Sequence, residues 1–152
     1  PLLSKYFGDS DFLSNNILHV HQPTVFRLSE QYLIRAEAYA MKKDYGKAGK
    51  DITTIRQARY STYGGNTALS ESNAMDVIAA ERVKELYMEG FRLNDLKRWH
   101  KGFERKVSDQ PAANFVQSGL KVEKDDALFV WPIPQYELES PGSQIEPNES
   151  NK

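Results

Sequence analysis

The sequence contains no cysteine, which excludes disulfide bonds, thiolate nucleophiles and thiolate metal ligands. It has no apolar run approaching roughly 18 residues, the length that a membrane-spanning helix needs. Neither sign of charge dominates, because 20 basic and 21 acidic residues give a net charge of −1. No basic stripe stands out, so we do not expect nucleic acid as a partner. The motifs of nucleotide-binding proteins, serine hydrolases and zinc proteases are also absent, and we expect no cofactor.

The chain begins at Pro1 and shows neither an initiator methionine nor the charged and apolar segments of an export signal. We therefore expect a piece of a longer protein, with any export or lipidation signal upstream. Its 152 residues are enough to bury a core, and 39% hydrophobic residues are typical of a folded segment. We expect a single domain.

A helical pattern begins at about Phe26, after an irregular lead-in over residues 1–25. Asp44 is placed to cap a second helix, which we expect to end within residues 56–59. Two helices joined by a tight turn predict an antiparallel hairpin. The pair Gly64-Gly65 then indicates a loop.

A third helix is expected from a cap at Ser70 or Ser72 to about Glu89, with Gly90 as a break or left-handed position. A short fourth helix follows. Its apolar face carries Leu93, Leu96 and Trp99, with Asp95 and Arg98 off that face.

The pattern as a whole predicts an all-α fold of two helical hairpins. Residues 26–101 would form the helical core, and residues 102–152 a mostly irregular wrap that includes an extended apolar segment at 127–131. The first hairpin resembles a tetratricopeptide unit, with small or aromatic residues at Ala36, Tyr39 and Ala48. The second departs from that pattern, so no regular repeat array is predicted.

Residues 81–100 interleave acids, bases and large apolar residues at helical spacing. Glu81, Glu85 and Glu89 share one stripe, and paired carboxylates of this kind occur in glycoside hydrolases. Nearby arginines would lower their pKa values, whereas a general acid needs the opposite shift. We therefore predict a structural ion network without catalytic residues, formed by Glu81, Arg82, Glu85, Glu89, Arg92, Asp95 and Arg98.

Other candidate sites are few. His19 and His21 would lie on one side of a strand, but with His100 as the only further histidine we expect no metal site. Trp99 and Trp131 could stack on a sugar. We expect Trp99 in the core and Trp131 as an anchor for the returning C-terminal segment. Tyr60 and Tyr63, in the glycine loop, are the candidates for contact with a ligand.

Four ordered segments resemble those of SusD/RagB-type proteins. Residues 27–38 read RLSEQYLIRAEA and are similar to that family's R-x-x-E-x-Y-L-x-x-A-E-A segment. Residues 81–99 read ERVKELYMEGFRLNDLKRW and match the family's E-R-x-x-E-L-x-x-E-G-x-R-x-x-D-L-x-R-W signature. Residues 55–59 resemble the end of its next helix, and residues 133–137 its I-P-x-x-E segment. The resemblance covers roughly residues 26–141.

This resemblance implies a helical fold and a non-enzymatic role. Family members are typically lipid-anchored at the outer surface of the outer membrane. There they capture glycans or other nutrients beside a TonB-dependent, SusC-like transporter. It also implies that this chain is the C-terminal part of a longer protein, held at the membrane only by an upstream lipid anchor.

The terminal segment departs from the family pattern, since residues 140–148 only approximate its closing Asn-Pro and Gln-Asn-Pro-Gly. None of the matched motifs contacts ligand in the family, so we expect the main ligand contacts upstream of this chain. The alternative is a tetratricopeptide-like adaptor that grips a peptide, although one hairpin makes a poor groove.

Overall fold

The computed structural model describes residues 25–105 and 121–151. The chain divides into two compact units, Pro1–Glu85 and Leu86–Lys152, and each is described by itself. Residues 1–24 of the predicted lead-in, including His19 and His21, lie outside the described residues, as do residues 106–120 and 152 of the predicted wrap. In the described part, no helix combines the length and the apolar character needed to cross a membrane. The prediction of a single domain stays a prediction.

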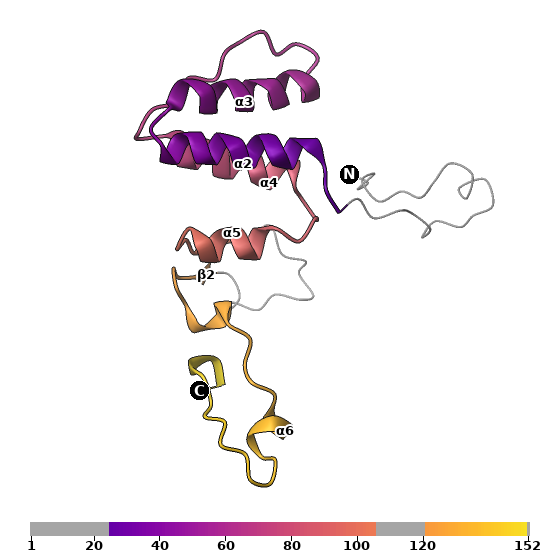
Figure 1. The fold of residues 1–152 in the computed structure, drawn as a ribbon, viewed down its shortest axis with the longest axis vertical. Helices are drawn as coiled ribbons and strands as arrows, with labels where there is room; N and C mark the ends of the chain where they lie inside the picture. The colour runs from indigo at the N-terminus through magenta and orange to yellow at the C-terminus, as the bar shows by residue number, and fades with distance from the viewer. Residues whose placement is uncertain (1–24, 106–120, 152) are drawn as a thin grey trace, which may run out of the picture. The chain divides into compact units, whose positions relative to one another are not determined.

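The first unit begins with a helical hairpin, α2 (Leu28–Met41) and α3 (Tyr45–Arg59), whose helices run antiparallel and side by side (Figure 1). Lys43 takes a left-handed conformation in the turn, with φ 61°. The Asp44 carboxylate then accepts a hydrogen bond from the backbone N–H of Lys47 at 3.2 Å. This bond satisfies one of the free N–H groups at the start of α3, and it confirms the cap expected at Asp44.

A third helix, α4 (Ala74–Glu85), contacts both helices of the hairpin and completes the core of the first unit. Leu33, Ile52 and Ile78 come from the three different helices, and each is fully buried. Ala36 and Ala48 are fully buried as well, and their small side chains let α2 and α3 approach closely. Burial of these side chains is the main source of stability for the unit.

The loop between α3 and α4 is attached to α3 by contacts of Thr67. The backbone N–H of Thr67 donates to the Thr53 hydroxyl at 2.8 Å. The Thr67 hydroxyl lies 2.9 Å from the Tyr63 hydroxyl and accepts a bond from Arg56. The Thr67 carbonyl approaches so near to α3 that a Cβ on Gly49 would lie 2.2 Å from its oxygen. Only glycine leaves room for this contact.

We expect Gly49→Ala to destabilise the protein by about 2 kcal/mol, because the added methyl group must displace a backbone carbonyl. In an unobstructed helix the same change would stabilise by up to about 1 kcal/mol. Gly46→Ala, in the first turn of the same helix, is the matched control, since its Cβ would meet nothing closer than 3.9 Å. Urea unfolding compares the two variants. A gain in stability for Gly49→Ala would show that the loop does not hold Thr67 there.

The third helix is shorter than predicted. α4 ends at Glu85 rather than at about Glu89, and its first residue is Ala74. Ser70 and Ser72 hydrogen-bond to one another through their hydroxyls at 3.0 Å. The Ser70 carbonyl accepts the backbone N–H of Ala74 at 2.9 Å, and the Asn73 side chain accepts the backbone N–H of Ser70, so the turn into the helix begins at Ser70.

The second unit has short helices and strands in its described residues, 86–105 and 121–151. It has α5 (Arg92–Arg98), an antiparallel pair of short strands, β1 (Phe103–Glu104) and β2 (Lys121–Val122), and then three single turns. The turns are η5 (Ala127–Phe129), α6 (Gln135–Leu138) and η6 (Glu149–Asn151). The left-handed position expected at Gly90 is confirmed, with φ 83°. Leu96, Val122 and Phe129 form the core of this unit, with Phe103 packed against them.

Two predictions about residues 127–131 are wrong. This segment begins with the turn η5 rather than in an extended conformation, because the Asp126 carboxylate accepts the backbone N–H of Leu128 and starts the turn. Trp131 is 83% exposed, so its indole is not packed as an anchor among the described residues. The C-terminal segment is held through side-chain amides instead. Asn148 donates to the Trp131 carbonyl at 3.0 Å, and Asn151 binds both the N–H and the carbonyl of Ile133. Over residues 25–105 and 121–151 the fold is helical apart from one short strand pair, which confirms the predicted all-α class.

Candidate functional site

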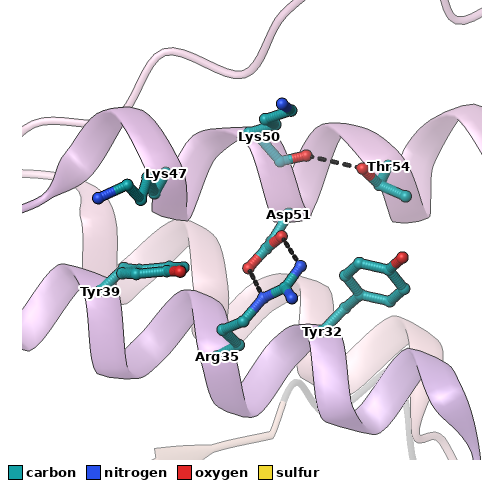
Figure 2. A pocket seen from close by; sticks show the side chains of 7 residues that line it. All are labelled: Tyr32, Arg35, Tyr39, Lys47, Lys50, Asp51 and Thr54. Carbon is teal, nitrogen blue, oxygen red and sulfur yellow. Dashed lines mark hydrogen bonds and ion pairs between the residues drawn. The ribbon is translucent and has the colours of Figure 1, made fainter.

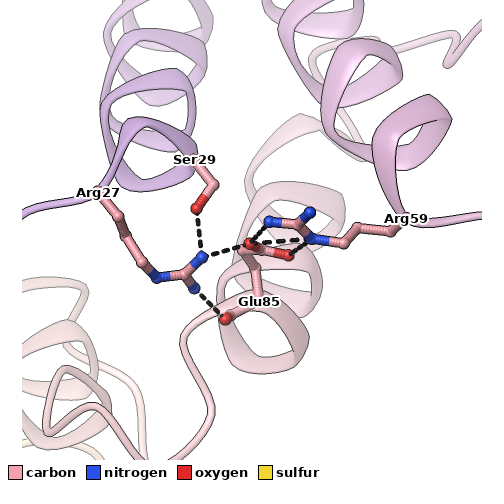
Figure 3. A network of polar contacts seen from close by, with 4 residues as sticks. All are labelled: Arg27, Ser29, Arg59 and Glu85. Carbon is pink, nitrogen blue, oxygen red and sulfur yellow. Dashed lines mark hydrogen bonds and ion pairs between the residues drawn. The ribbon is translucent and has the colours of Figure 1, made fainter. Parts of the chain in front are cut away.

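The Glu85 carboxylate lies where three segments of the first unit meet (Figure 3). Arg27, just before α2, donates to one oxygen at 2.6 Å. Arg59, the last residue of α3, donates from Nε and Nη2 at 2.9 and 2.7 Å. Arg27 also donates to the Glu85 carbonyl and, at 2.6 Å, to the hydroxyl of Ser29. The Glu85 side chain is only 8% exposed.

The ionised form of Glu85 is favoured strongly. Burial by itself would raise its pKa, but the hydrogen bonds from Arg59 and Arg27 outweigh burial and lower the pKa to about 2. A carboxyl group with this pKa holds no proton near neutral pH. It therefore cannot serve as the general acid that glycoside hydrolysis needs.

This pKa predicts a loss of stability in acid. The pKa of Glu85 is about 2 in the fold against 4.5 as the ordinary value, so the unfolded chain binds more protons between these values. The stabilisation is complete above about pH 4.5 and is lost as the pH falls toward 2, with a total of about 3 kcal/mol. Urea unfolding at pH 7 and pH 2.5 measures it, with Glu85→Gln as the control that lacks this titration. Equal pH dependence in the two proteins would contradict the prediction.

Two further buried acids of the first unit are bound by arginines from other helices. Glu81 on α4 accepts from Arg56 Nε of α3 at 2.9 Å. Asp51 on α3 accepts two parallel bonds from Arg35 of α2, at 2.8 and 2.7 Å. Such paired bonds fix the relative register of the two helices as well as neutralising charge.

These contacts involve only two of the seven residues predicted to form an ion network, Glu81 and Glu85. Arg82 is buried on α4, and Glu89 is half-buried in the second unit. In α5, Asp95 is 3% exposed and accepts from Arg98 at 3.0 Å, whereas Arg92 is exposed. Asp95 therefore lies inside the unit and not off its buried face, where the sequence placed it. Leu93, expected on that face, is exposed. A single network through all seven residues stays a prediction.

The arginines that bind Glu81 and Glu85 were missed at the sequence level. The prediction took their partners from their own segment, at Arg82, Arg92 and Arg98. The bonds described above come from Arg27, Arg56 and Arg59, which are at least 25 residues away along the chain. Helical periodicity shows which residues share a face, but it does not show which helices meet.

The loop tyrosines differ in exposure. Tyr60 is 47% exposed, while Tyr63 is half-buried, and their rings lie 6.5 Å apart. The Tyr63 hydroxyl bonds to Thr67, and this bond together with the Arg56 guanidinium lowers its pKa. Tyr63 thus folds back onto the unit. Contact of either tyrosine with a ligand stays a prediction.

The remaining candidates show no site either. Trp99 is half-buried beneath the guanidinium of Arg98, which lies 4.3 Å from the ring centre. His100 pairs with Asp125 at 2.6 Å on the surface. Among residues 25–105 and 121–151, no three or more metal-ligating side chains come together.

A groove between α2 and α3 gathers a different set of side chains, which the sequence reading did not single out (Figure 2). Its volume is about 360 Å³. It is lined by two tyrosines, three cationic residues, one acid and a threonine: Tyr32, Tyr39, Arg35, Lys47, Lys50, Asp51 and Thr54. The feature of the sequence that could have indicated this groove is the seven-residue spacing of Tyr32 and Tyr39, which places both rings on one face of α2.

The comparison with protein families decides the identity of the chain. The model of the SusD family matches residues 1–148. The chain belongs to the SusD family. Neither the comparison with curated proteins nor that with solved structures gave a match.

The structure gives a physical reason for the SusD-type motifs quoted above. Arg27 comes from the first motif, Arg59 from the second and Glu85 from the third, and the three meet in one bonded cluster. Three segments that are distant in the sequence are thereby tied at one point. In this SusD-family chain these three motif residues therefore join the helices to one another.

Proposed function

We propose that this chain belongs to a non-enzymatic protein that captures glycans or other nutrients and passes them to a TonB-dependent, SusC-like transporter. The observation that carries the proposal is the match of the SusD family over residues 1–148. Membership of this family suggests nutrient binding at the outward-facing surface of the outer membrane. A lipid anchor upstream of this chain would hold the protein there.

The chemistry of the buried acids supports a binding role. Both Glu85 and Glu81 are bound by arginines, and the lowered pKa of Glu85 makes that carboxyl unsuitable as the proton donor that hydrolysis requires. The hairpin and α4 form a packed scaffold with a fully buried core. A rigid scaffold lowers the ordering cost of capturing a ligand, because few side chains must be immobilised on binding.

The test uses the full protein, including any residues that precede Pro1. Calorimetry against a panel of oligosaccharides should show binding, while the sugars stay intact when reducing ends are counted after incubation. Purification of the tagged protein from outer membranes should bring a SusC-like transporter with it. Sugar cleavage would overturn the non-enzymatic role. Failure to bind any sugar, with a peptide-binding partner recovered instead, would favour the tetratricopeptide-like adaptor.

A further inference from the structure

The groove between α2 and α3 has the size and chemistry of a small ligand site. Its volume of about 360 Å³ lies within the range of roughly 300–1,000 Å³ typical of ligand sites. Tyr32 and Tyr39 stand along α2, about 10 Å apart from the helical rise. Both are half-buried, so each ring is held in place while part of its surface stays open. The groove lies on two regular helices, which fix its shape.

Positive charge lies beside both rings. The Arg35 guanidinium is 5.0 Å from the centre of the Tyr32 ring, and the Lys47 ammonium is 5.4 Å from the centre of the Tyr39 ring. Lys50 is exposed, and in Figure 2 its ammonium points away from α2, so rotation about its flexible stem is needed to bring the charge over the groove. Within residues 25–105 and 121–151, no group is seen to bind its ammonium.

The negative charge in the groove is not accessible to a ligand. Asp51 is the acid among the lining residues, its side chain is 6% exposed, and Arg35 binds both of its oxygens. Asp44 lies beside the groove and pairs with Lys47 at 2.6 Å, in a contact open to solvent on both sides. The accessible polar groups are therefore the Lys50 ammonium, the Lys47 ammonium with its Asp44 partner, and two phenolic hydroxyls, which can both donate and accept. Such a set favours a ligand rich in acceptors, above all an anion.

We propose that this groove binds a sugar acid, with a tyrosine ring against the sugar and the sugar carboxylate at Lys47 and Lys50. That the ligand is a sugar rests on the function proposed above. That the sugar is acidic rests on the cationic side chains of the groove. A uronic acid unit combines a flat polyhydroxylated ring with one carboxylate, which matches aromatic surface beside cationic groups. The site would be additional to the contacts expected upstream of this chain.

The test is calorimetry of the full protein with tri-galacturonate and with maltotriose, a neutral sugar of the same length. Tri-galacturonate should bind more tightly, and its affinity should fall as sodium chloride is raised, because exposed charges are screened. The double variant Lys47→Gln, Lys50→Gln should weaken this binding about tenfold. The variant Tyr32→Leu should weaken it several-fold while keeping an apolar side chain in the helix.

The control removes the same charge elsewhere. Lys84→Gln with Lys97→Gln changes two exposed lysines that do not line the groove, and tri-galacturonate affinity should stay unchanged. Thermal unfolding confirms that each variant folds. Sugar binding that is equal in the wild type and the double variant would overturn the groove site and leave the proposed function standing. Absence of binding to these sugars and to the whole glycan panel would overturn both.

Discussion

Replacement of Glu85 by Gln should lower the free energy of unfolding by about 4 kcal/mol, because it leaves two guanidinium groups without their shared anion. The amide of Gln adds to the loss, since its NH₂ group would face the N–H donors of Arg27 and Arg59. Urea unfolding at pH 7, followed by circular dichroism, gives the difference directly.

Glu71→Gln is the matched control for this prediction. Glu71 pairs with Lys43 at 3.2 Å, but both side chains are about three-quarters exposed, at 75% and 73%. An exposed pair contributes less than about 1 kcal/mol, because water solvates both ions. If Glu85→Gln proved as mild as this control, the cluster at Glu85 would be a surface ion pair in energetic terms, and the helices would be held by apolar packing alone.

Leu33→Ala should also destabilise by about 4 kcal/mol. Leu33 is fully buried on α2, the helix that contacts both α3 and α4, so its removal leaves a cavity that rigid neighbours cannot fill. The comparison is Ile34→Ala, one residue further along the same helix and 47% exposed, which should lose less than about 1 kcal/mol. Chemical denaturation of the two variants side by side measures both values. Similar losses for the pair would mean that the core does not centre on Leu33.

Local signals in the sequence predicted local structure well. The cap at Asp44 and the left-handed glycine at Gly90 follow from backbone geometry within a few residues, and the structure has both. The hairpin of α2 and α3 follows from apolar periodicity and a short connection. The end of the third helix was placed four residues too late. The charged and apolar pattern continues beyond Glu85, but the chain forms a turn there. In this turn the backbone N–H of Glu89 donates to the Leu86 carbonyl.

Contacts that join distant segments could not be predicted in the same way. Nothing near Glu85 in the sequence points to Arg27 or Arg59, because their meeting depends on how three helices pack. The groove beside Asp51 was missed for the same reason, since its walls come from two helices. For Trp131, an apolar composition and a following proline favoured burial, yet the amides of Asn148 and Asn151 hold the backbone and leave the indole exposed.

The attachment of the α3–α4 loop at Thr67 divides that loop into two parts with different tolerance to engineering. Thr67 ties the chain to α3, and residues 68–73 then lead to α4. At Gly64 and Gly65, by contrast, an added side chain would meet nothing within 4 Å. These two glycines are therefore the place to insert an epitope or attach a fluorescent dye, so that binding or transporter association can be followed without disturbing the three helices.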